Sequence, residues 1–424
     1  MKNDFAMRQL ALNGGEPAVS FEQPHEIWPP PATREELEEL CKQRQTDISI
    51  KGRTGVIKEL EEQYLQFLDS DVRYGLTFNS GTSALLAAYF ALGIEEGDEV
   101  IGSVLTFHAA LSPALMLKAN IRLVDVERNS RCLDPEKLES AITARTKVIT
   151  VVHQWGHPAD MDRILKIAKK HKLKVIEDCS HAHGSRFRGK LCGTFGDVAV
   201  FSFQAAKMIF AGEGGILVTN NQDIHERATL LGHYRDRSKE EILNPQLQQY
   251  WVTGFGLKLR MSPLNAVVAK HALRNFSKFK AGRHRCLNFF NQALSSIDYI
   301  EPHHVEPEVD MGAWYGFKPL YLPEKLPGTT FKKVTEALRA EGVEVSQASA
   351  PLLCTQPLYS LYPDDMYPNR TKKIVQSVDE FPVANCIYNN CFSLPTFYDW
   401  DRDRPIIEQY IAAFHKVGAA FGGR

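Results

Sequence analysis

A lysine and an aspartate follow two successive apolar runs of the chain and together have the chemistry of a cofactor site. Asp178 ends the run of residues 174–178, and Lys207 comes shortly after the run of residues 198–203. Most lysines lie at the surface, but this one stands between phenylalanines in a stretch too apolar for an ordinary surface loop. Burial disfavours the charged form of an amine, and the neutral amine attacks an aldehyde more readily. The pair therefore predicts a site for pyridoxal 5'-phosphate, with Lys207 holding the aldehyde and Asp178 keeping the ring nitrogen protonated.

Asp178 also has two simpler interpretations, a solvated carboxylate at a strand end or the cap of a following helix. The functional interpretation is an ion pair with the pyridinium nitrogen, because an opposite charge at close range favours both charged forms. The adjacent Glu177 points to the opposite face of an extended strand. Only one of the two acids is therefore expected to face the site.

The stretch of residues 80–93 (SGTSALLAAYFALG) begins with small and hydroxyl residues and continues with apolar positions at helical spacing. Free N–H groups at the start of such a helix bind phosphate, which makes Gly81 and Thr82 candidate phosphate ligands. Ser202 offers a further hydroxyl group. Ordinary capping of the helix explains the same opening residues, and Ser202 has the alternative of a hydrogen-bonded core serine.

Two further positions are weaker candidates. Phe107 stands after an apolar run and is suited to stack on a flat ring, although an aromatic residue there is more often part of a core. His181 and His183 lie two residues apart without a Cys/His pair at ligand spacing. No metal site is therefore expected.

The elements that must position these residues alternate between short β-branched runs and helical patterns. The expected strands are residues 99–107, 121–126, 147–153, 174–178, 198–203 and 216–219. Their near-continuous apolar character indicates burial on both faces, and the alternation with helices predicts a mostly parallel, doubly wound α/β sheet. Functional groups of such sheets gather at the carboxyl ends of the strands, where Phe107, Asp178 and Lys207 fall.

The alternation ends near residue 235. A Gln-rich loop at 243–250, helices at 264–296 and 331–341 and a strand-like segment at 316–322 predict a smaller α+β unit. Residues 1–50 are rich in proline and acids, with one helical pattern at 34–44, and are expected to form an arm over the main domain. The predicted division is an arm at 1–50, a large cofactor-binding α/β domain at 51–260 and a small C-terminal α+β domain at 261–424.

The composition is that of an ordinary globular protein. The 424 residues are 44% hydrophobic and 24% charged, with a formal net charge of −1, so no global charge favours nucleic acid or an anionic membrane. The eight cysteines are scattered and predict neither a disulfide framework nor a zinc site. The first residues lack an apolar signal region, and no apolar run is long enough to span a membrane, so a cytoplasmic protein is expected.

The ordered motifs resemble those of the DegT/DnrJ/EryC1/StrS family of pyridoxal-phosphate aminotransferases. They are Gly81-Thr82 opening a helix, Thr106-Phe107, EDCSHAHG at 177–184, FSFQAAK at 201–207, GEGG at 212–215 and GLKLRMSPL at 256–264. The resemblance covers about residues 8–420 and implies a fold type I enzyme acting on keto-sugars or keto-cyclitols. The opening segment LALNGGEP at 10–17 is similar to the branch with inosose aminotransferases and aminohydroxybenzoate synthases.

The resemblance also implies roles for individual residues. Lys207 binds the cofactor covalently, Asp178 partners the ring nitrogen, and Phe107 stacks on the ring. His181 contacts the side of the 3-hydroxyl group, and Gly81, Thr82 and Ser202 hold the phosphate. Family members reach the phosphate with an asparagine or lysine of the neighbouring subunit, which corresponds to Lys258 and implies a homodimer with shared active sites.

The implied reaction moves an amino group from glutamate or glutamine to a keto-sugar or keto-cyclitol, in amino-sugar, aminocyclitol or antibiotic biosynthesis. The residues before the lysine depart from the Gln-Asn-Gly-Lys pattern of many members, and family dehydratases carry histidine in place of the lysine that this chain keeps. Other interpretations are a lyase, an aromatising enzyme or a non-catalytic cofactor-binding regulator of the same family. A Rossmann dehydrogenase is disfavoured because no G-x-G-x-x-G follows the first strand. Acceptor contacts are expected from residues 153–158, residues 234–238 and the arm around Trp28.

Overall fold

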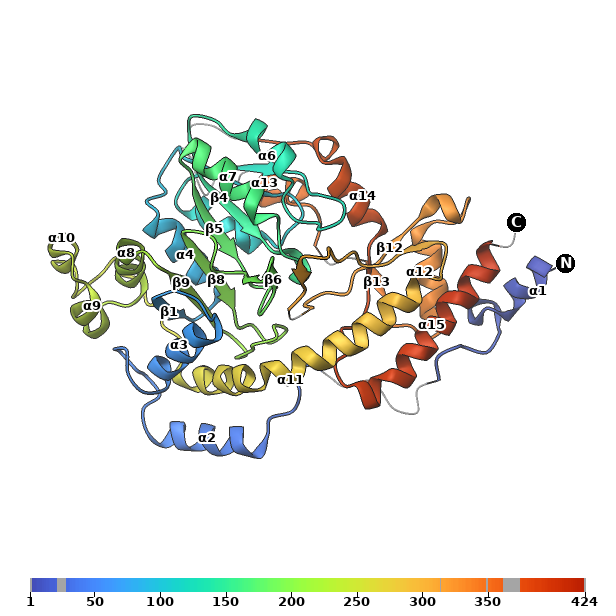
Figure 1. Cartoon of the computed structure of the whole chain (residues 1–424), viewed down its shortest axis with the longest axis horizontal. Helices are drawn as coiled ribbons and strands as arrows, with labels where there is room; N and C mark the ends of the chain where they lie inside the picture. The colour runs from blue at the N-terminus through green and yellow to red at the C-terminus, as the bar shows by residue number, and fades with distance from the viewer. Residues whose placement is uncertain (1, 21–27, 313, 348–349, 361–373, 423–424) are drawn as a thin grey trace.

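The centre of the protein is a seven-stranded sheet, as a computed structural model shows (Figure 1). The structure describes residues 2–20, 28–312, 314–347, 350–360 and 374–422. The strand order is β1-β9-β8-β5-β4-β2-β3, and β9 runs antiparallel to both of its neighbours while the other pairs are parallel. The strands are β1 (Tyr74–Phe78), β2 (Glu99–Ser103), β3 (Asn120–Val124), β4 (Thr146–Val152), β5 (Lys174–Asp178), β8 (Val198–Ser202) and β9 (Gly215–Thr219). The predicted α/β class is confirmed.

Both faces of the sheet are buried, as the apolar character of the strands predicts. Along β4, Val148 and Val152 pack into one hydrophobic cluster, and Ile149 and Val151 pack into another on the opposite face. This alternation is the two-residue period of an extended strand. The helices α4 (Gly81–Ala91) and α8 (Gln222–Gly232) pack against each other and cover one face. The helices α3 (Gly55–Phe67), α6 (Pro135–Ala141) and α7 (Met161–His171) also pack on the strands.

The C-terminal part has its own hydrophobic cluster around two long helices. α11 (Pro263–Leu294) packs against α15 (Trp400–Gly422), and α15 also packs against α12 (Phe331–Ala340). Figure 1 shows α11 running from beneath the sheet to this second group of elements. The short strands β10 (Ile300–Glu301) and β12 (Leu320–Tyr321) pair beside it. By contrast, α14 (Pro382–Asn390) packs on the cluster that covers the sheet.

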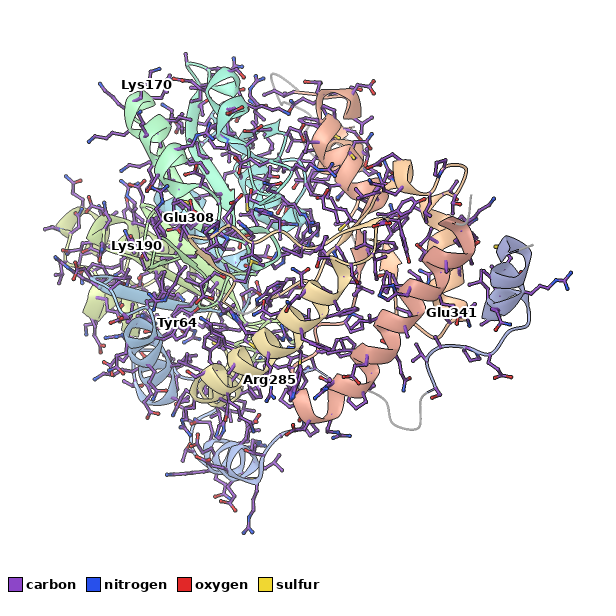
Figure 2. All side chains as sticks on the ribbon, turned by 45° about the vertical axis from the view of Figure 1, so that its right-hand side comes forward. Tyr64, Lys170, Lys190, Arg285, Glu308 and Glu341 are labelled. Carbon is purple, nitrogen blue, oxygen red and sulfur yellow. The ribbon has the colours of Figure 1, made fainter. Side chains whose placement is uncertain are left out.

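The first helices pack along this C-terminal part. α1 (Lys2–Gln9) lies against α15, and α2 (Arg34–Gln45) lies against α11 (Figure 1). Glu341 follows α12 (Figure 2) and is fully buried. Its carboxylate accepts the backbone N–H groups of Ala11 and Ala18 at 2.8 and 2.9 Å and pairs with Lys416 at 2.7 Å. The carboxylate therefore ties the N-terminal segment to the C-terminal elements.

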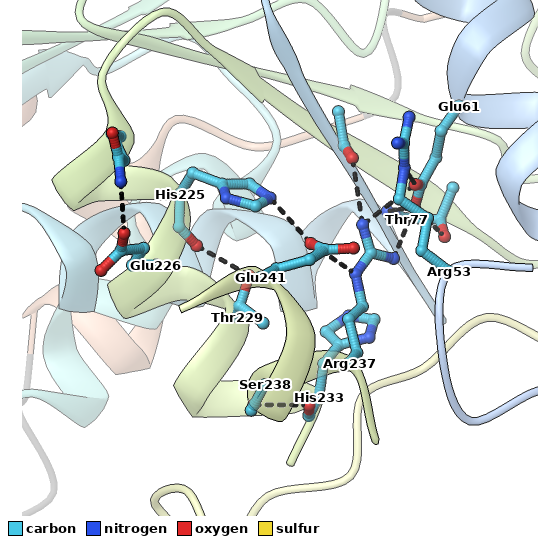
Figure 3. A network of polar contacts seen from close by, with 12 residues as sticks. Arg53, Glu61, Thr77, His225, Glu226, Thr229, His233, Arg237, Ser238 and Glu241 are labelled. Carbon is cyan, nitrogen blue, oxygen red and sulfur yellow. Dashed lines mark hydrogen bonds and ion pairs between the residues drawn. The ribbon is translucent and has the colours of Figure 1, made fainter. Parts of the chain in front are cut away.

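A buried ion-pair network fixes the edge strand β1 (Figure 3). Glu61, on α3, accepts the backbone N–H and the hydroxyl group of Thr77, both at 2.9 Å. It also pairs with Arg237 at 2.8 Å and with Arg53 at 3.0 Å. Arg237 lies at the start of α9 (Asp236–Glu241) and pairs there with Glu241 at 3.1 Å. The network joins the consecutive elements α3 and β1 to α9, and its residues Glu61 and Arg237 are 176 positions apart in the sequence.

Several element boundaries differ from the prediction. The strand predicted at 99–107 ends at Ser103, and the strand-like segment at 316–322 contains only the two residues of β12. The predicted Gln-rich loop contains the short helix α10 (Pro245–Gln248). β1 was missed because its sequence, YGLTF, has a glycine and a threonine inside it, and its partner β9 lies far along the chain. Within the described residues, no helix combines the length and apolarity needed to cross a bilayer.

Candidate active site

A cavity of about 790 Å³ opens at the carboxyl end of the sheet strands. Phe107 follows β2, Asp178 ends β5 and Lys207 follows β8, and all three line this cavity. Gly81, Thr82, His181 and Ser202 line it as well. Of the residues predicted from the sequence, Lys258 alone lies outside, on an exposed segment that forms an isolated bridge with His233.

Lys207 is a buried amine with little compensation for its charge. Its side chain is 8% exposed, and its Nζ lies 4.1 Å from the centroid of the Tyr315 ring. Burial lowers the pKa of Lys207 to about 8, although the charge of Asp178 opposes this change. The indole N–H of Trp28 donates to the Lys207 carbonyl at 3.2 Å and helps to hold the loop. The amine therefore loses its proton more easily than a surface lysine does.

Asp178 faces the same cavity from the end of β5. It is 6% exposed, and its Oδ1 accepts the backbone N–H of Ser180 at 3.0 Å. Glu177 points to the other face, where it accepts N–H groups of Gly193 and Phe195 at 2.8 and 2.7 Å. The strand alternation thus separates a site-facing acid from a structural one, as the sequence predicts.

The two histidines that follow β5 have separate roles. Nδ1 of His181 accepts the backbone N–H of Trp155 at 3.4 Å, and the ring stacks on Tyr315 with centroids 4.0 Å apart. Burial and the nearby charges of Lys207 and Lys318 hold the pKa of His181 well below its usual value. The neutral ring therefore carries its proton on Nε2. His181 is a hydrogen-bond donor at the cavity wall.

His183 supports the strand end instead. Its Nε2 donates to the Ser202 carbonyl at 3.0 Å, and its Nδ1 faces the Tyr64 hydroxyl group at 3.3 Å. Both ring nitrogens are occupied, and burial lowers its pKa to about 3. His183 therefore has no free nitrogen with which to bind a metal ion.

A second buried cluster contains residue types that bind metal ions, but hydrogen bonds within the protein occupy its histidine and its carboxylate. His153, Glu177 and Cys179 lie close together. Nδ1 of His153 accepts the backbone N–H of Ala159 at 3.1 Å, so Nε2 donates to Glu177 at 3.1 Å. Burial alone would raise the pKa of Glu177, but its hydrogen bonds to His153 and to backbone N–H groups lower it. This arrangement braces the turn after β4.

The start of α4 and the end of β8 form a cradle for an anion. Ser80 caps the helix by accepting the Ser83 N–H at 3.0 Å, and Ala84 bonds to the Ser80 carbonyl at 3.2 Å. Within the described part of the chain, the N–H groups of Gly81 and Thr82 have no acceptor. A Cβ atom at Gly81 would lie 2.8 Å from the Cβ of Ser202. Only glycine therefore lets the helix start approach Ser202 this closely, and the donors fit a phosphate group.

Phe107 and Trp28 are aromatic residues that line the cavity. Phe107 is 54% exposed and tilts against His108, so one side of its ring remains free for a flat ligand. Trp28 packs edge-to-face on Phe210 and stands beneath the Arg283 guanidinium at 4.2 Å. Of the loops expected to contact an acceptor, 153–158 and the arm around Trp28 reach the cavity, but residues 234–238 do not.

Sequence reasoning missed the wall that the C-terminal part contributes. Tyr315, Lys318, Ser393 and Thr396 line the cavity, although they are distant in sequence from every cofactor motif. The one local signal was a lysine in an apolar run, FKPLYL, at residues 317–322. Gly316 bonds to the Trp155 carbonyl at 3.2 Å, which joins this wall to the turn after β4.

Comparison with known proteins agrees with this geometry. The chain matches the DegT/DnrJ/EryC1/StrS aminotransferase family over residues 31–408. The L-glutamine:scyllo-inosose aminotransferase of Streptomyces griseus is 33% identical over 353 residues, covering 81% of this chain and 81% of that protein. The GDP-perosamine synthase of Caulobacter vibrioides is 34% identical over 322 residues, covering 76% and 83%.

Comparison with solved structures also finds aminotransferases. The structure of an aminotransferase from Psychrobacter cryohalolentis superposes with a TM-score of 0.81 at 24% identity, covering 94% of this chain and 100% of that one. This likeness establishes the fold type I architecture predicted from the sequence. The chain therefore belongs to the DegT/DnrJ/EryC1/StrS aminotransferase family, whose members are pyridoxal-phosphate-dependent transaminases.

Proposed function

We propose that this protein transfers the amino group of glutamate or glutamine to a keto-sugar or keto-cyclitol with pyridoxal phosphate as its cofactor. The observation that carries the proposal is the presence of Lys207 and Asp178 in one cavity, beside an anion cradle at the start of α4. The names of the relatives, which include an L-glutamine:scyllo-inosose aminotransferase and a GDP-perosamine synthase, support the substrate class.

Each residue has a defined task in this proposal. Gly81, Thr82 and Ser202 hold the phosphate, and Phe107 covers one face of the ring. Asp178 holds the ring nitrogen in its protonated form, and His181 donates from Nε2 toward the 3-oxygen. When bound, the cofactor supplies the electron sink for the carbanion formed at the amino acid.

Lys207 performs the acid–base work. In its neutral form it takes the proton from the α-carbon of the amino donor, and in its charged form it returns a proton to the cofactor's C4' carbon. A pKa of about 8 suits both directions near neutral pH. The same steps in reverse deliver the amino group to the ketone.

A screen of the two half-reactions tests this proposal. The holoenzyme is mixed with L-glutamine or L-glutamate while the cofactor spectrum is recorded, and the aminated form is then offered inososes and nucleotide-linked keto-sugars. We expect loss of the band near ~420 nm with the donor and its return with one acceptor class. Failure of every donor to change the spectrum would contradict the proposal.

We also propose that the enzyme is a homodimer in which Lys258 serves the partner's site. Lys258 lies on an exposed segment, and large apolar side chains around it are also exposed, including Val252, Phe255 and Leu257 at 46%, 52% and 39%. Such a patch is typical of a protein interface. The charge of Lys258 suits a phosphate dianion.

Mixing two inactive variants tests the shared site. In a hybrid of Lys207→Ala and Lys258→Ala subunits, one site receives an intact Lys207 and an intact Lys258 only if Lys258 acts across the interface. We expect activity to return on mixing, toward one functional site per hybrid dimer. No recovery in hybrids whose formation is verified by mass spectrometry would mean that Lys258 does not act on the neighbouring site.

A further inference from the structure

A second lysine, Lys318, lines the cavity from the C-terminal wall. The segment that contains it runs antiparallel to residues 391–394, with the Leu394 N–H donating to the Phe317 carbonyl at 3.2 Å and the Phe392 N–H to the Pro319 carbonyl at 3.0 Å. This pairing places Lys318 opposite Ser393, and its Nζ bonds to the Ser393 hydroxyl group. Both residues line the same cavity as Lys207.

The charge of Lys318 has no carboxylate partner within the described part of the chain. The side chain is 8% exposed, and its Nζ lies 5.7 Å from the centroid of the Trp155 ring. Burial lowers the pKa of Lys318, and the neighbouring Arg131 guanidinium acts in the same direction. A buried ammonium group of this kind is stabilised strongly by an anion.

Two polar atoms elsewhere in the cavity lining are also without hydrogen bonds among the described residues. Within the part of the chain that the structure describes, the Oε1 of Gln154 and the Oγ1 of Thr106 have no hydrogen bond, and the two residues are 5% and 2% exposed. Both residues line the cavity. Unpaired buried polar atoms cost free energy, so they indicate that a polar ligand occupies the cavity.

The four charged residues among the described cavity-lining residues divide by task. In the proposed function, Asp178 faces the cofactor ring nitrogen and Lys207 carries out the proton transfer. Glu213 carries a negative charge and cannot pair with an anion. Lys318 is therefore the remaining cation. Its neighbours include Trp155, Ser393 and Arg131. The phosphate cradle is built from Gly81 and Ser202, so the two anion sites use different walls.

We propose that Lys318, with the Ser393 hydroxyl group, binds the α-carboxylate of the amino-acid donor. This inference rests on the proposed function, because it assigns a subsite to that reaction. The α-carboxylate is bonded to the carbon that Lys207 deprotonates, so its cation must share the cavity with Lys207. The deep burial of Lys318 suits a compact carboxylate that enters with the donor, rather than the bulky diphosphate of a nucleotide sugar at the mouth.

The test compares L-glutamine with L-glutaminamide, in which a neutral amide replaces the α-carboxylate. Half-reactions of the holoenzyme are followed by the cofactor spectrum in the wild type and in Lys318→Met. We expect kcat/KM for glutamine to fall about 100-fold in the variant, in line with the loss of a charged hydrogen bond. The value for glutaminamide should change by less than about threefold, and Lys318→Arg should restore part of the preference for glutamine.

Binding of glutarate, an unreactive dicarboxylate, gives a readout that does not depend on turnover. Calorimetry should show a Kd about 100-fold weaker in Lys318→Met than in the wild type. Lys270→Met is the matched control, because Lys270 is also buried but pairs with Glu59 away from the cavity, and it should keep the wild-type values.

Three results would overturn the inference. The first is an equal loss of kcat/KM for glutamine and for glutaminamide in Lys318→Met. The second is no loss of kcat/KM for either donor, and the third is an effect confined to the acceptor half-reaction. A wild-type enzyme that reacts with no amino acid would instead contradict the proposed function, while glutarate binding would still report on Lys318. The two failures are therefore distinguishable.

Discussion

The Nζ of Lys207 lies 4.1 Å from the centroid of the Tyr315 ring, so the loop after β8 and the C-terminal wall meet at the reactive amine. A cation over an aromatic face is favoured by the ring quadrupole, and Asp178 also favours the charged amine. Burial nevertheless outweighs both, because the pKa of Lys207 falls to about 8. The cavity thus supplies an amine that can be neutral near physiological pH.

The first prediction concerns the pH dependence of cofactor capture. Below its pKa, Lys207 is protonated and has no lone pair for the aldehyde, and above its pKa the amine is free. The rate at which cofactor-free protein captures pyridoxal phosphate should therefore rise with pH, about tenfold per unit, and level off above a pH of about 8. Stopped-flow absorbance measures this rate. A rate that continues to rise to a pH of about 10 would indicate an ordinary, solvated lysine.

The second prediction concerns Asp178. The change Asp178→Asn keeps an oxygen for the Ser180 N–H but removes the negative charge that would hold the ring nitrogen protonated. The half-reaction with the amino donor should slow by at least about 100-fold, equivalent to about 2.7 kcal/mol of activation free energy. Asp162→Asn is the control, since that carboxylate pairs with Arg188 outside the cavity. A rate within about threefold of the wild type would refute the assignment.

Site residues that follow a clear strand pattern could be predicted from the sequence. Site residues that reach the cavity through contacts between distant segments could be found only in the structure. Asp178 and Lys207 could be found because each follows a strand that reads clearly as an apolar run. Tyr315 and Lys318 could not, because their segment reaches the cavity through pairing with residues 391–394, a contact that no local pattern encodes. The same limit applies to β1. Its sequence pattern is weak, and pairing with β9 and the Glu61 network hold it in the sheet.

The third prediction tests the anion cradle. In Gly81→Ala the new Cβ would lie 2.8 Å from the Ser202 Cβ, so the start of α4 must move away from β8. We expect the Kd for pyridoxal phosphate to rise by at least about tenfold, because the N–H donors lose their position. Gly52→Ala is the control, since its nearest neighbours are 3.9 Å away. Fluorescence titration of the cofactor-free proteins measures both, and unchanged affinity in Gly81→Ala would argue against this phosphate site.

The fourth prediction concerns the stability of the fold at β1. Glu61→Ala removes the carboxylate that Arg237 and Thr77 share, which leaves Glu241 as the only carboxylate paired with the buried Arg237 guanidinium among the described residues. The free energy of unfolding should fall by about 3–5 kcal/mol. Glu38→Ala breaks an exposed pair with Arg34 and should cost less than about 1 kcal/mol. Urea denaturation of the two variants makes the comparison, and similar losses in both would show that the network adds little.

Reduction of the holoenzyme with borohydride tests the central claim most directly. Borohydride fixes the bond between an amine and the cofactor aldehyde, and peptide mass spectrometry then locates the modified residue. We predict that the label lies on Lys207 and that Lys207→Ala takes up no label and lacks the band near ~420 nm. A label on Lys318 or on any other lysine, or no label in the wild type, would contradict the account.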